Sequence, residues 1–185
     1  MKMIAKGRSL AVAGMLAATA TAAAPCLAQT TAIVKRNVPI YAVDARGIGA
    51  KLGTIELRDV TDGLRLKIDL ENLPPGPHGF HVHTVADCSP AQIGGRVVPA
   101  GAAGGPYDPF RTGHHAGPHG NGYLGDLPVL SVGTNGKAKY TMVASRLKVD
   151  DVRNRSLLIT AGSDNYSDNP PMGGGGDAIA CGMVR

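Results

Sequence analysis

Long apolar runs are scarce in this chain of 185 residues, and the run near its start is too short to cross a membrane. That run covers residues 10–16 and leads into a stretch rich in alanine and threonine, whereas a transmembrane helix needs about 20 apolar residues. The basic residues before it and the small residues that end at Cys26-Leu27-Ala28 are typical of a secretory signal peptide. We therefore predict a signal peptide over residues 1–28, rather than a membrane anchor or a lipid at Cys26.

Strong charge is also lacking once that segment is removed. The segment carries three basic and no acidic residues, so the formal net charge falls from +5 to +2 (5 − 3). The remaining residues, 29–185, are numerous enough for one domain with its own core. No basic patch predicts contact with nucleic acid, and none predicts contact with a membrane after cleavage. The sequence identifies no protein partner and leaves a homodimer open.

Cysteine is rare: the chain has three, and Cys26 belongs to the predicted signal peptide. We expect a periplasmic or secreted protein, and in such an oxidising compartment Cys88 and Cys181 most simply form one disulfide. A disulfide that closes a loop of about 90 residues is expected to stabilise the fold by about 4–5 kcal/mol in the chain-entropy description.

Helical periodicity is nearly absent, and alternation of apolar and polar residues takes its place. Residues 64–70, Leu-Arg-Leu-Lys-Ile-Asp-Leu, show it most clearly, and such alternation indicates a strand with one buried face. Short strands at this spacing predict an antiparallel sandwich or barrel. Two glycine-rich segments, 84–125 and 162–176, are predicted as long functional loops. The predicted strands are residues 38–43, 51–58, 64–70, 80–83, 139–144, 157–161 and 178–184.

Two groups of histidines carry the ligand types of a metal site. His81 and His83 are two residues apart on a predicted strand, so both imidazoles point to the same face, and two imidazoles suit copper or zinc. The second group is His114, His115 and His119, followed by Asp126, and these are zinc-type ligands. The alternatives are a pair of histidines without a ligand and a solvated polar loop.

These residues occur within a series of motifs that resembles the bacterial, periplasmic branch of the copper/zinc superoxide dismutases. The resemblance extends over about residues 38–184. It implies an all-β fold, an eight-stranded antiparallel Greek-key barrel with a metal site between two long loops. The motifs, in order, are Gly79-Phe80-His81-Val82-His83, Gly101-Ala102-Ala103-Gly104-Gly105, Thr112-Gly113-His114-His115-Ala116-Gly117-Pro118, Gly125-Asp126-Leu127-Pro128, Asp164-Asn165-Tyr166-Ser167-Asp168, and Gly173-Gly174-Gly175-Gly176 followed by Ala180-Cys181-Gly182.

The resemblance also assigns roles to single residues. It implies that Cys88 and Cys181 form the family's disulfide, that His81 and His83 are copper ligands, and that His115 and Asp126 are zinc ligands. Asp164 matches the carboxylate that links a copper histidine to a zinc histidine, with Tyr123 at its zinc-side partner's position. His78 matches a structural position, and we expect it to anchor a loop.

Four family positions hold residues that cannot perform the family's chemistry. The resemblance expects the bridging histidine at Pro106, a zinc histidine at Tyr123 and the last copper histidine at Thr160. It expects at Ala178 the arginine that attracts superoxide. His114 and His119 are candidate substitutes in a zinc site with His115 and Asp126.

Three functions follow from this mixture of retained and lost residues. The first is an exported protein that binds copper, and zinc as a second candidate ion, through a reduced ligand set with weak or no dismutase activity. The second is an active superoxide dismutase with a copper-only site. The third is a metal-free barrel that acts as a binding module.

Overall fold

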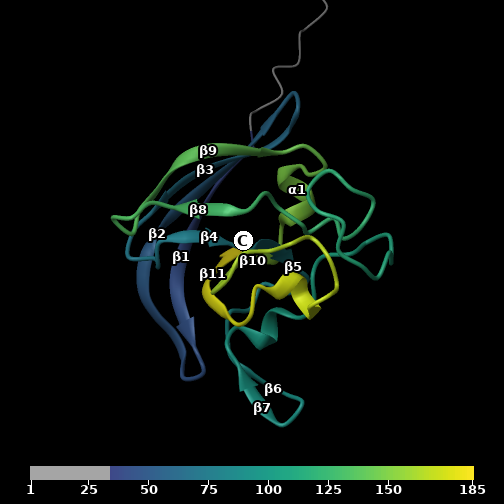
Figure 1. The fold of residues 1–185 in the computed structure, drawn as a ribbon. Coiled ribbons are helices and arrows are strands. Elements are labelled where there is room, and N and C mark those ends of the chain that lie inside the picture. Colours follow the sequence, from purple (N-terminus) through teal and green to yellow (C-terminus); the bar gives the residue numbers. More distant parts are fainter. Residues whose placement is uncertain (1–33) are drawn as a thin grey trace, which may run out of the picture. The chain divides into compact units, whose positions relative to one another are not determined.

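The structure, a computed structural model, describes residues 34–185, and the predicted signal peptide lies outside this range. Antiparallel strands dominate it, and a curled seven-stranded sheet is its main element (Figure 1). No helix in residues 34–185 has the length and apolar character of a membrane span. The order in the sheet is β5-β10-β11-β1-β2-β3-β9. These strands are β1 (Lys35–Asp44), β2 (Gly47–Val60), β3 (Gly63–Leu70), β5 (Phe80–His83), β9 (Ala138–Ala144), β10 (Arg155–Thr160) and β11 (Ala178–Val184).

A second, two-stranded pairing completes the barrel. β4 (Gly76–His78) pairs with β8 (Leu130–Val132). β4 and β5 are two halves of one strand interrupted at Gly79, whose amide donates to the Gly162 carbonyl at 2.8 Å. Counted in this way, β1, β2, β3, β4/β5, β8, β9, β10 and β11 are the eight strands of the expected barrel.

The alternation in residues 64–70 places its apolar side chains in the barrel core. Leu64, Leu66 and Leu70 are fully buried there, while Lys67 and Asp69 on the other face are exposed. Burial of each such leucine stabilises a fold by about 1.5–3 kcal/mol. The same core receives Phe80 and Val82 of β5, so the histidines between and beyond them face away from it.

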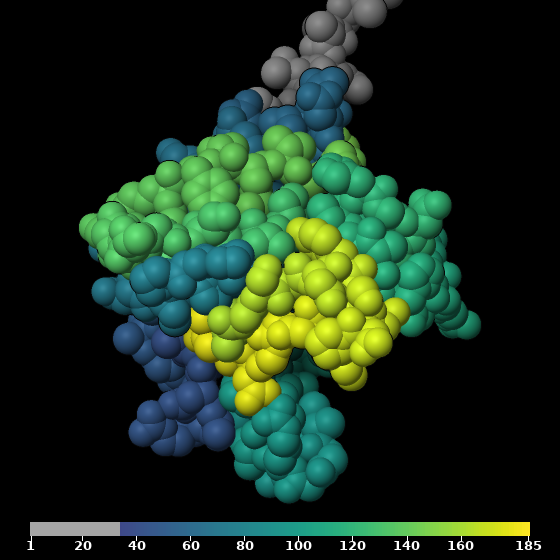
Figure 2. All heavy atoms as spheres, viewed as in Figure 1, coloured from purple at the N-terminus to yellow at the C-terminus, as the bar shows by residue number. Residues whose placement is uncertain are grey.

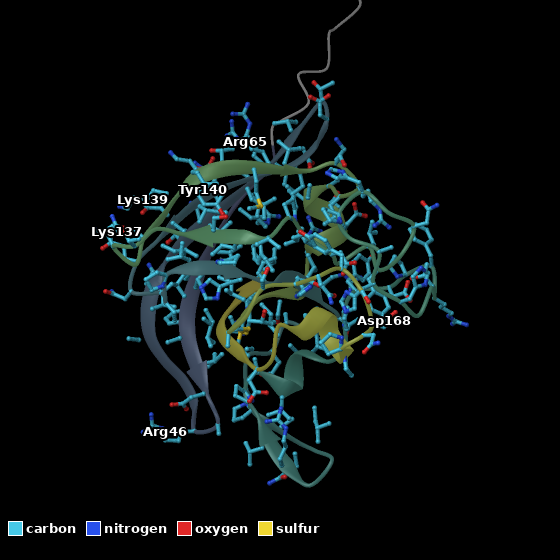
Figure 3. The ribbon with its side chains drawn as sticks, viewed as in Figure 1. Arg46, Arg65, Lys137, Lys139, Tyr140 and Asp168 are labelled. Atoms are coloured by element: carbon cyan, nitrogen blue, oxygen red, sulfur yellow. A yellow bond between two sulfur atoms is a disulfide. The ribbon has the colours of Figure 1, made fainter. Side chains whose placement is uncertain are left out.

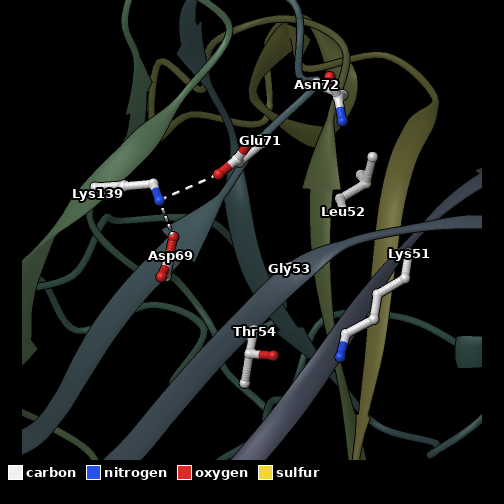
Figure 4. Close-up of a pocket in the computed structure, with 8 residues that line it drawn as sticks. All are labelled: Lys51, Leu52, Gly53, Thr54, Asp69, Glu71, Asn72 and Lys139. Atoms are coloured by element: carbon white, nitrogen blue, oxygen red, sulfur yellow. Dashed lines mark ion pairs between the residues drawn. The ribbon is translucent and has the colours of Figure 1, made fainter.

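The outer face of the sheet carries charged side chains. Figure 3 labels Arg65, Lys137 and Lys139 on this side. Lys139 of β9 lies between Asp69 and Glu71, at 2.9 and 3.1 Å from their carboxylates (Figure 4). These groups are about half exposed, and exposed ion pairs contribute little to stability. The hollow beside them is therefore a solvated surface.

The two long segments pack together at one end of the barrel. Figure 2 shows the second segment, in yellow, against parts of the first, in teal and green. The first contains the hairpin β6 (Ala91–Ile93) and β7 (Arg96–Val98) and the 3-10 turn η1 (Gly101–Ala103). The second contains the 3-10 turn η2 (Pro171–Gly174), and the single α-helical turn α1 (Val149–Val152) precedes β10.

Several predicted boundaries were wrong. β2 begins at Gly47, four residues before the predicted start, because the turn of its hairpin is only Ala45-Arg46. β4 and β8 were missed because each has three residues, and β4 contains a proline and a glycine. The first long segment is not without structure, since it forms the β6–β7 hairpin around Gly94-Gly95.

The predicted disulfide is confirmed: Cys88 and Cys181 are bonded, with Cα atoms 5.8 Å apart and 93 residues between them in sequence number. It ties the first long segment to β11, and both cysteines are buried. We expect Cys88→Ser/Cys181→Ser to lower the free energy of unfolding by about 4–5 kcal/mol, because the unfolded chain regains the entropy of a long loop. Denaturant unfolding of both proteins measures this, and a difference below about 1 kcal/mol would contradict the prediction.

Candidate metal centre

β5 places two histidines on one face, as predicted. His81 and His83 are both buried, with ring centroids 6.4 Å apart. Phe80 and Val82 alternate with them and point into the core. The first long segment bonds to β5, since the Tyr107 amide donates to the Val82 carbonyl at 2.8 Å.

His81 is held by a carboxylate on the second long segment. Its Nε2 lies 2.5 Å from Oδ2 of Asp164. Burial opposes the charge of Asp164, but hydrogen bonds from His81 and from the Tyr166 amide outweigh it and lower the pKa of this carboxyl. The ionised carboxylate accepts, so Nε2 carries the proton and, in the neutral ring, Nδ1 carries a lone pair. Nδ1 is buried and has no hydrogen-bond partner in the described part of the chain.

His83 is held by a backbone carbonyl. Its Nδ1 donates to the Gly104 oxygen at 2.6 Å, which leaves Nε2 as the bare nitrogen of the neutral ring. Burial lowers the pKa of His83 to about 4, so the ring is neutral at pH 7. A neutral imidazole whose other nitrogen donates to a fixed acceptor is the usual form of a metal-binding histidine.

His115 and Asp126 form a second buried pair. His115 Nδ1 lies 2.8 Å from Asp126 Oδ1, and Asp126 Oδ2 also accepts from the Ala116 and Gly117 amides at 3.1 and 2.9 Å. Burial disfavours the charged imidazole, but the hydrogen bond and charge of Asp126 outweigh it and raise the pKa of His115. His115 Nε2 is buried and has no partner among residues 34–185.

The two pairs meet. His81, His115, Asp126 and Asp164 each offer one ligand atom, and these four atoms lie within 4.8 Å of one another. The ring centroids of His81 and His115 are 5.5 Å apart. The imidazole near Asp164 on the expected zinc side is therefore that of His115, whereas the resemblance implies Tyr123 at that position. Tyr123 instead lies edge-on to the His115 ring, with centroids 4.7 Å apart.

Three of the four altered positions lie close to His83 or to the backbone of its neighbours. Pro106 pairs with the backbone of His83 in a β-bridge. Thr160 is buried, and its hydroxyl lies within hydrogen-bonding distance of the Gly79 and Gly162 carbonyls, at 3.3 and 3.0 Å. Ala178 lines a pocket of about 490 Å³ together with His83, Pro106 and Thr160.

The other histidines lie apart from this group. His114 Nδ1 contacts the Thr112 carbonyl at 2.9 Å, and His119 Nδ1 contacts the Ser145 hydroxyl at 3.3 Å. Neither is among the four residues whose ligand atoms converge, so their part in a zinc site stays a prediction. The ring nitrogens of His78 lie 2.8 Å from the Thr160 and Pro74 carbonyls, which is an anchoring arrangement.

Comparison with known proteins settles the family. The family described as copper/zinc superoxide dismutase (SODC) matches residues 51–184. This chain belongs to the copper/zinc superoxide dismutase family. The Cu-Zn superoxide dismutase of Brucella abortus is 45% identical over 163 residues, which cover 87% of this chain and 91% of the relative. A solved Cu/Zn superoxide dismutase from Brucella abortus superposes with a TM-score of 0.80 and covers 82% of this chain and 100% of its own.

A solved SOD-like protein from Bacillus subtilis is more distant. It is 29% identical and superposes with a TM-score of 0.65, covering 83% of this chain and 100% of its own. A variant of that protein, in which a tyrosine and a proline are replaced by histidines, has also been solved.

The donor set fits the family's metals. Copper and zinc both bind imidazole nitrogen, and two buried histidines here have a ring nitrogen without a hydrogen bond in residues 34–185. Two carboxylates beside them would balance the charge of a cation.

Sequence reasoning missed one residue that shapes this site, Gly173. Its φ is +64°, and a Cβ there would lie 1.8 Å from Asp164 Oδ1. The run of four glycines was the available signal, but nothing in the run shows which glycine touches the carboxylate.

We expect Gly173→Ala to displace Asp164 and weaken its hydrogen bond to His81. Gly176→Ala is a matched control, because Gly176 has a similar φ of +71° but open space around its missing Cβ. Both substitutions place a Cβ at a positive φ and destabilise the fold by about 1 kcal/mol or more. Any further loss of stability in Gly173→Ala is therefore caused by the collision of its Cβ with Asp164. Thermal unfolding and the proton resonance of His81 Nε2–H measure the two effects. An equal loss of thermal stability in both variants, with the His81 Nε2–H resonance retained in both, would contradict the prediction.

Proposed function

We propose that this protein is an exported, copper-binding member of the family in which His81 and His83 hold the ion and dismutase activity is weak or absent. The observation that supports it is the orientation of the two rings. Each donates from one nitrogen to a fixed acceptor, Asp164 or Gly104, and each keeps its other nitrogen bare. This is how proteins prepare imidazoles for a metal.

The separation of the rings is compatible with one shared ion. With metal–nitrogen bonds of about 2.0 Å and about 1.1 Å from nitrogen to ring centre, two imidazoles on opposite sides of an ion have centroids about 6.2 Å apart. The observed separation is 6.4 Å. Copper, when bound, supplies one-electron redox chemistry, and copper in its reduced state accepts few ligands.

The residues around this pair support weak rather than full activity. Thr160 directs its hydroxyl to backbone carbonyls, and Pro106 has no side-chain donor atom. Neither offers nitrogen to an ion beside His83. Fixed positive charge at a narrow site raises the encounter rate with an anion by about 10 to 1,000-fold, and Ala178 offers none. The Bacillus protein is called SOD-like, and its variant exchanged a proline and a tyrosine for histidine, the residue types at Pro106 and Tyr123 here.

A second candidate is an active superoxide dismutase with a copper-only site. The names of the relatives favour it, since the proteins that match at 40–46% identity are called superoxide dismutases. Under this candidate the two histidines alone support turnover of superoxide to oxygen and hydrogen peroxide. A metal-free binding module is the third candidate, and the buried, bare nitrogens of His81 and His115 count against it.

Zinc is a further part of this proposal. His115 and Asp126 are the zinc-type residues, and His115 Nδ1 lies within hydrogen-bonding distance of Asp126 Oδ1, at 2.8 Å. His114 and His119 are the candidate additional ligands. The periplasm or the exterior is the proposed location, which the disulfide supports.

Copper loading combined with an activity assay tests the proposal. We expect the purified protein to bind about one copper ion per chain, and His81→Ala and His83→Ala each to abolish this, because one imidazole alone is a weak site. His114→Ala is the matched control and should retain copper, since its ring is exposed. Elemental analysis after dialysis gives the stoichiometry. Absence of bound copper in the parent protein would contradict the proposal and leave the metal-free module.

The rate of superoxide consumption separates the two copper candidates. We expect little activity in the copper-loaded protein, and Thr160→His with Ala178→Arg to raise it, because these changes restore a nitrogen donor and a steering charge. The steering charge alone is expected to contribute about tenfold or more at low ionic strength. Stopped-flow decay of superoxide measures both proteins. Robust turnover by the unaltered protein would replace our proposal with the active dismutase.

A further inference from the structure

The pocket beside His83 is mainly apolar. It encloses about 490 Å³, and Val98, Pro99, Leu158 and Ala178 are among its walls. Ile93 and Met172 also line it and are 52% and 37% exposed, so apolar side chains reach the surface there. Pockets of this size, with apolar walls and few polar groups, are typical of small-molecule sites.

The polar groups of the pocket leave one imidazole as the recognition element. Thr160 lines the pocket, but its hydroxyl lies near the Gly79 and Gly162 carbonyls. His83 commits Nδ1 to the Gly104 carbonyl. Its Nε2 is thus the side-chain acceptor available to a ligand that carries an N–H or O–H donor.

The charge of the pocket is balanced. Among its lining residues within 34–185, Arg96 is the one cation and Asp177 the one anion. The guanidinium of Arg96 bonds both carboxylate oxygens of Asp177, with NH1 to Oδ2 at 3.0 Å. A bidentate pair of this kind satisfies both partners, so a bound anion finds no free cation in the pocket.

We propose that this pocket binds a neutral aromatic molecule that carries one N–H or O–H donor, with Nε2 of His83 as the acceptor and the Arg96–Asp177 pair excluding anions. The apolar walls hold the ring, and the imidazole fixes its orientation. This binding requires no metal. Copper held by His83 would occupy the same Nε2, so the aromatic ligand and the ion compete for this nitrogen.

Phenol and benzoate are a neutral and an anionic probe of similar size. In the metal-free full chain we expect phenol to shift the amide resonances of Gly104, Gly105 and Gly176, with an affinity about threefold to fivefold higher than that of benzoate. Benzoate finds no free positive charge in the pocket. An exposed ion pair with such a charge would raise its affinity by a factor of up to about five. Two-dimensional NMR titration measures both affinities. Equal affinities, or phenol shifts spread over the outer sheet face, would overturn the proposal.

Release of Arg96 tests the role of the ion pair. Asp177→Asn should raise benzoate affinity by about threefold to fivefold and leave phenol affinity unchanged. The matched control is Asp44→Asn, because Asp44 also holds an arginine, Arg46, at the β1–β2 turn outside the pocket (Figure 3). A gain in benzoate affinity in both variants, or in neither, would contradict the role assigned to the Arg96–Asp177 pair.

Blocking variants test the location. Ala178→Leu fills the pocket from β11 and should abolish phenol binding in a protein with an unchanged amide spectrum elsewhere. If that variant does not fold, Val98→Phe fills the same pocket from the more exposed β6–β7 hairpin. Phenol affinity that persists in a folded blocking variant would show that the pocket is not the site.

Discussion

A buried hydrogen bond between His81 and Asp164 is the interaction on which the candidate site depends. It joins β5 of the barrel to the second long segment, 83 residues later in the chain. A carboxylate buried without a partner is costly, so this segment cannot move away from the barrel freely. The bond also fixes the tautomer of His81. Because Nε2 donates, Nδ1 is the nitrogen left without a hydrogen-bond partner within residues 34–185.

The electrostatics of the rest of the site are set by two buried carboxylates. Asp126 and Asp164 are both buried, with the two imidazoles beside them. Backbone amides satisfy part of each carboxylate: those of Ala116 and Gly117 bond Asp126, and that of Tyr166 bonds Asp164. The remaining negative charge explains why the pKa of His115 is raised. His83 has no carboxylate bound to it, and its pKa is lowered mainly by burial and further by the charges of His81 and His115. The site therefore divides into an anionic half that favours a cation and a neutral half beside an apolar pocket.

Much of the fold could be predicted because it depends on local pattern. The alternation in residues 64–70 specified a strand and its buried face, and the spacing of His81 and His83 specified their common face. The motifs predicted the family, and the disulfide was predicted both from the two remaining cysteines and from the family. β4 could not be found in this way, because its proline and its three residues carry no alternation. The β6–β7 hairpin had a signal in Gly94-Gly95, both of which adopt positive φ, and two glycines in a row are typical of a tight hairpin turn.

The arrangement of the site was less predictable because its contacts join distant segments. Nothing in the local sequence shows that Asp164 lies close to His115 or that Gly173 is packed against the Asp164 carboxylate. Nor does it show that Arg96 of the hairpin binds Asp177, which follows the second segment. Resemblance located the altered positions but not what surrounds them. The structure shows that these positions border a pocket with balanced charge. The family resemblance alone predicts an anion channel that has lost its arginine.

X-ray absorption at the copper edge tests the central claim most directly, because it counts the imidazoles bound to the ion. With reduced copper bound to the full chain, the account predicts scattering from two imidazole nitrogens at about 1.9–2.0 Å, lost when His81 and His83 are replaced by alanine. A site with three or more imidazoles, or copper scattering that is unchanged in the double variant, would contradict it.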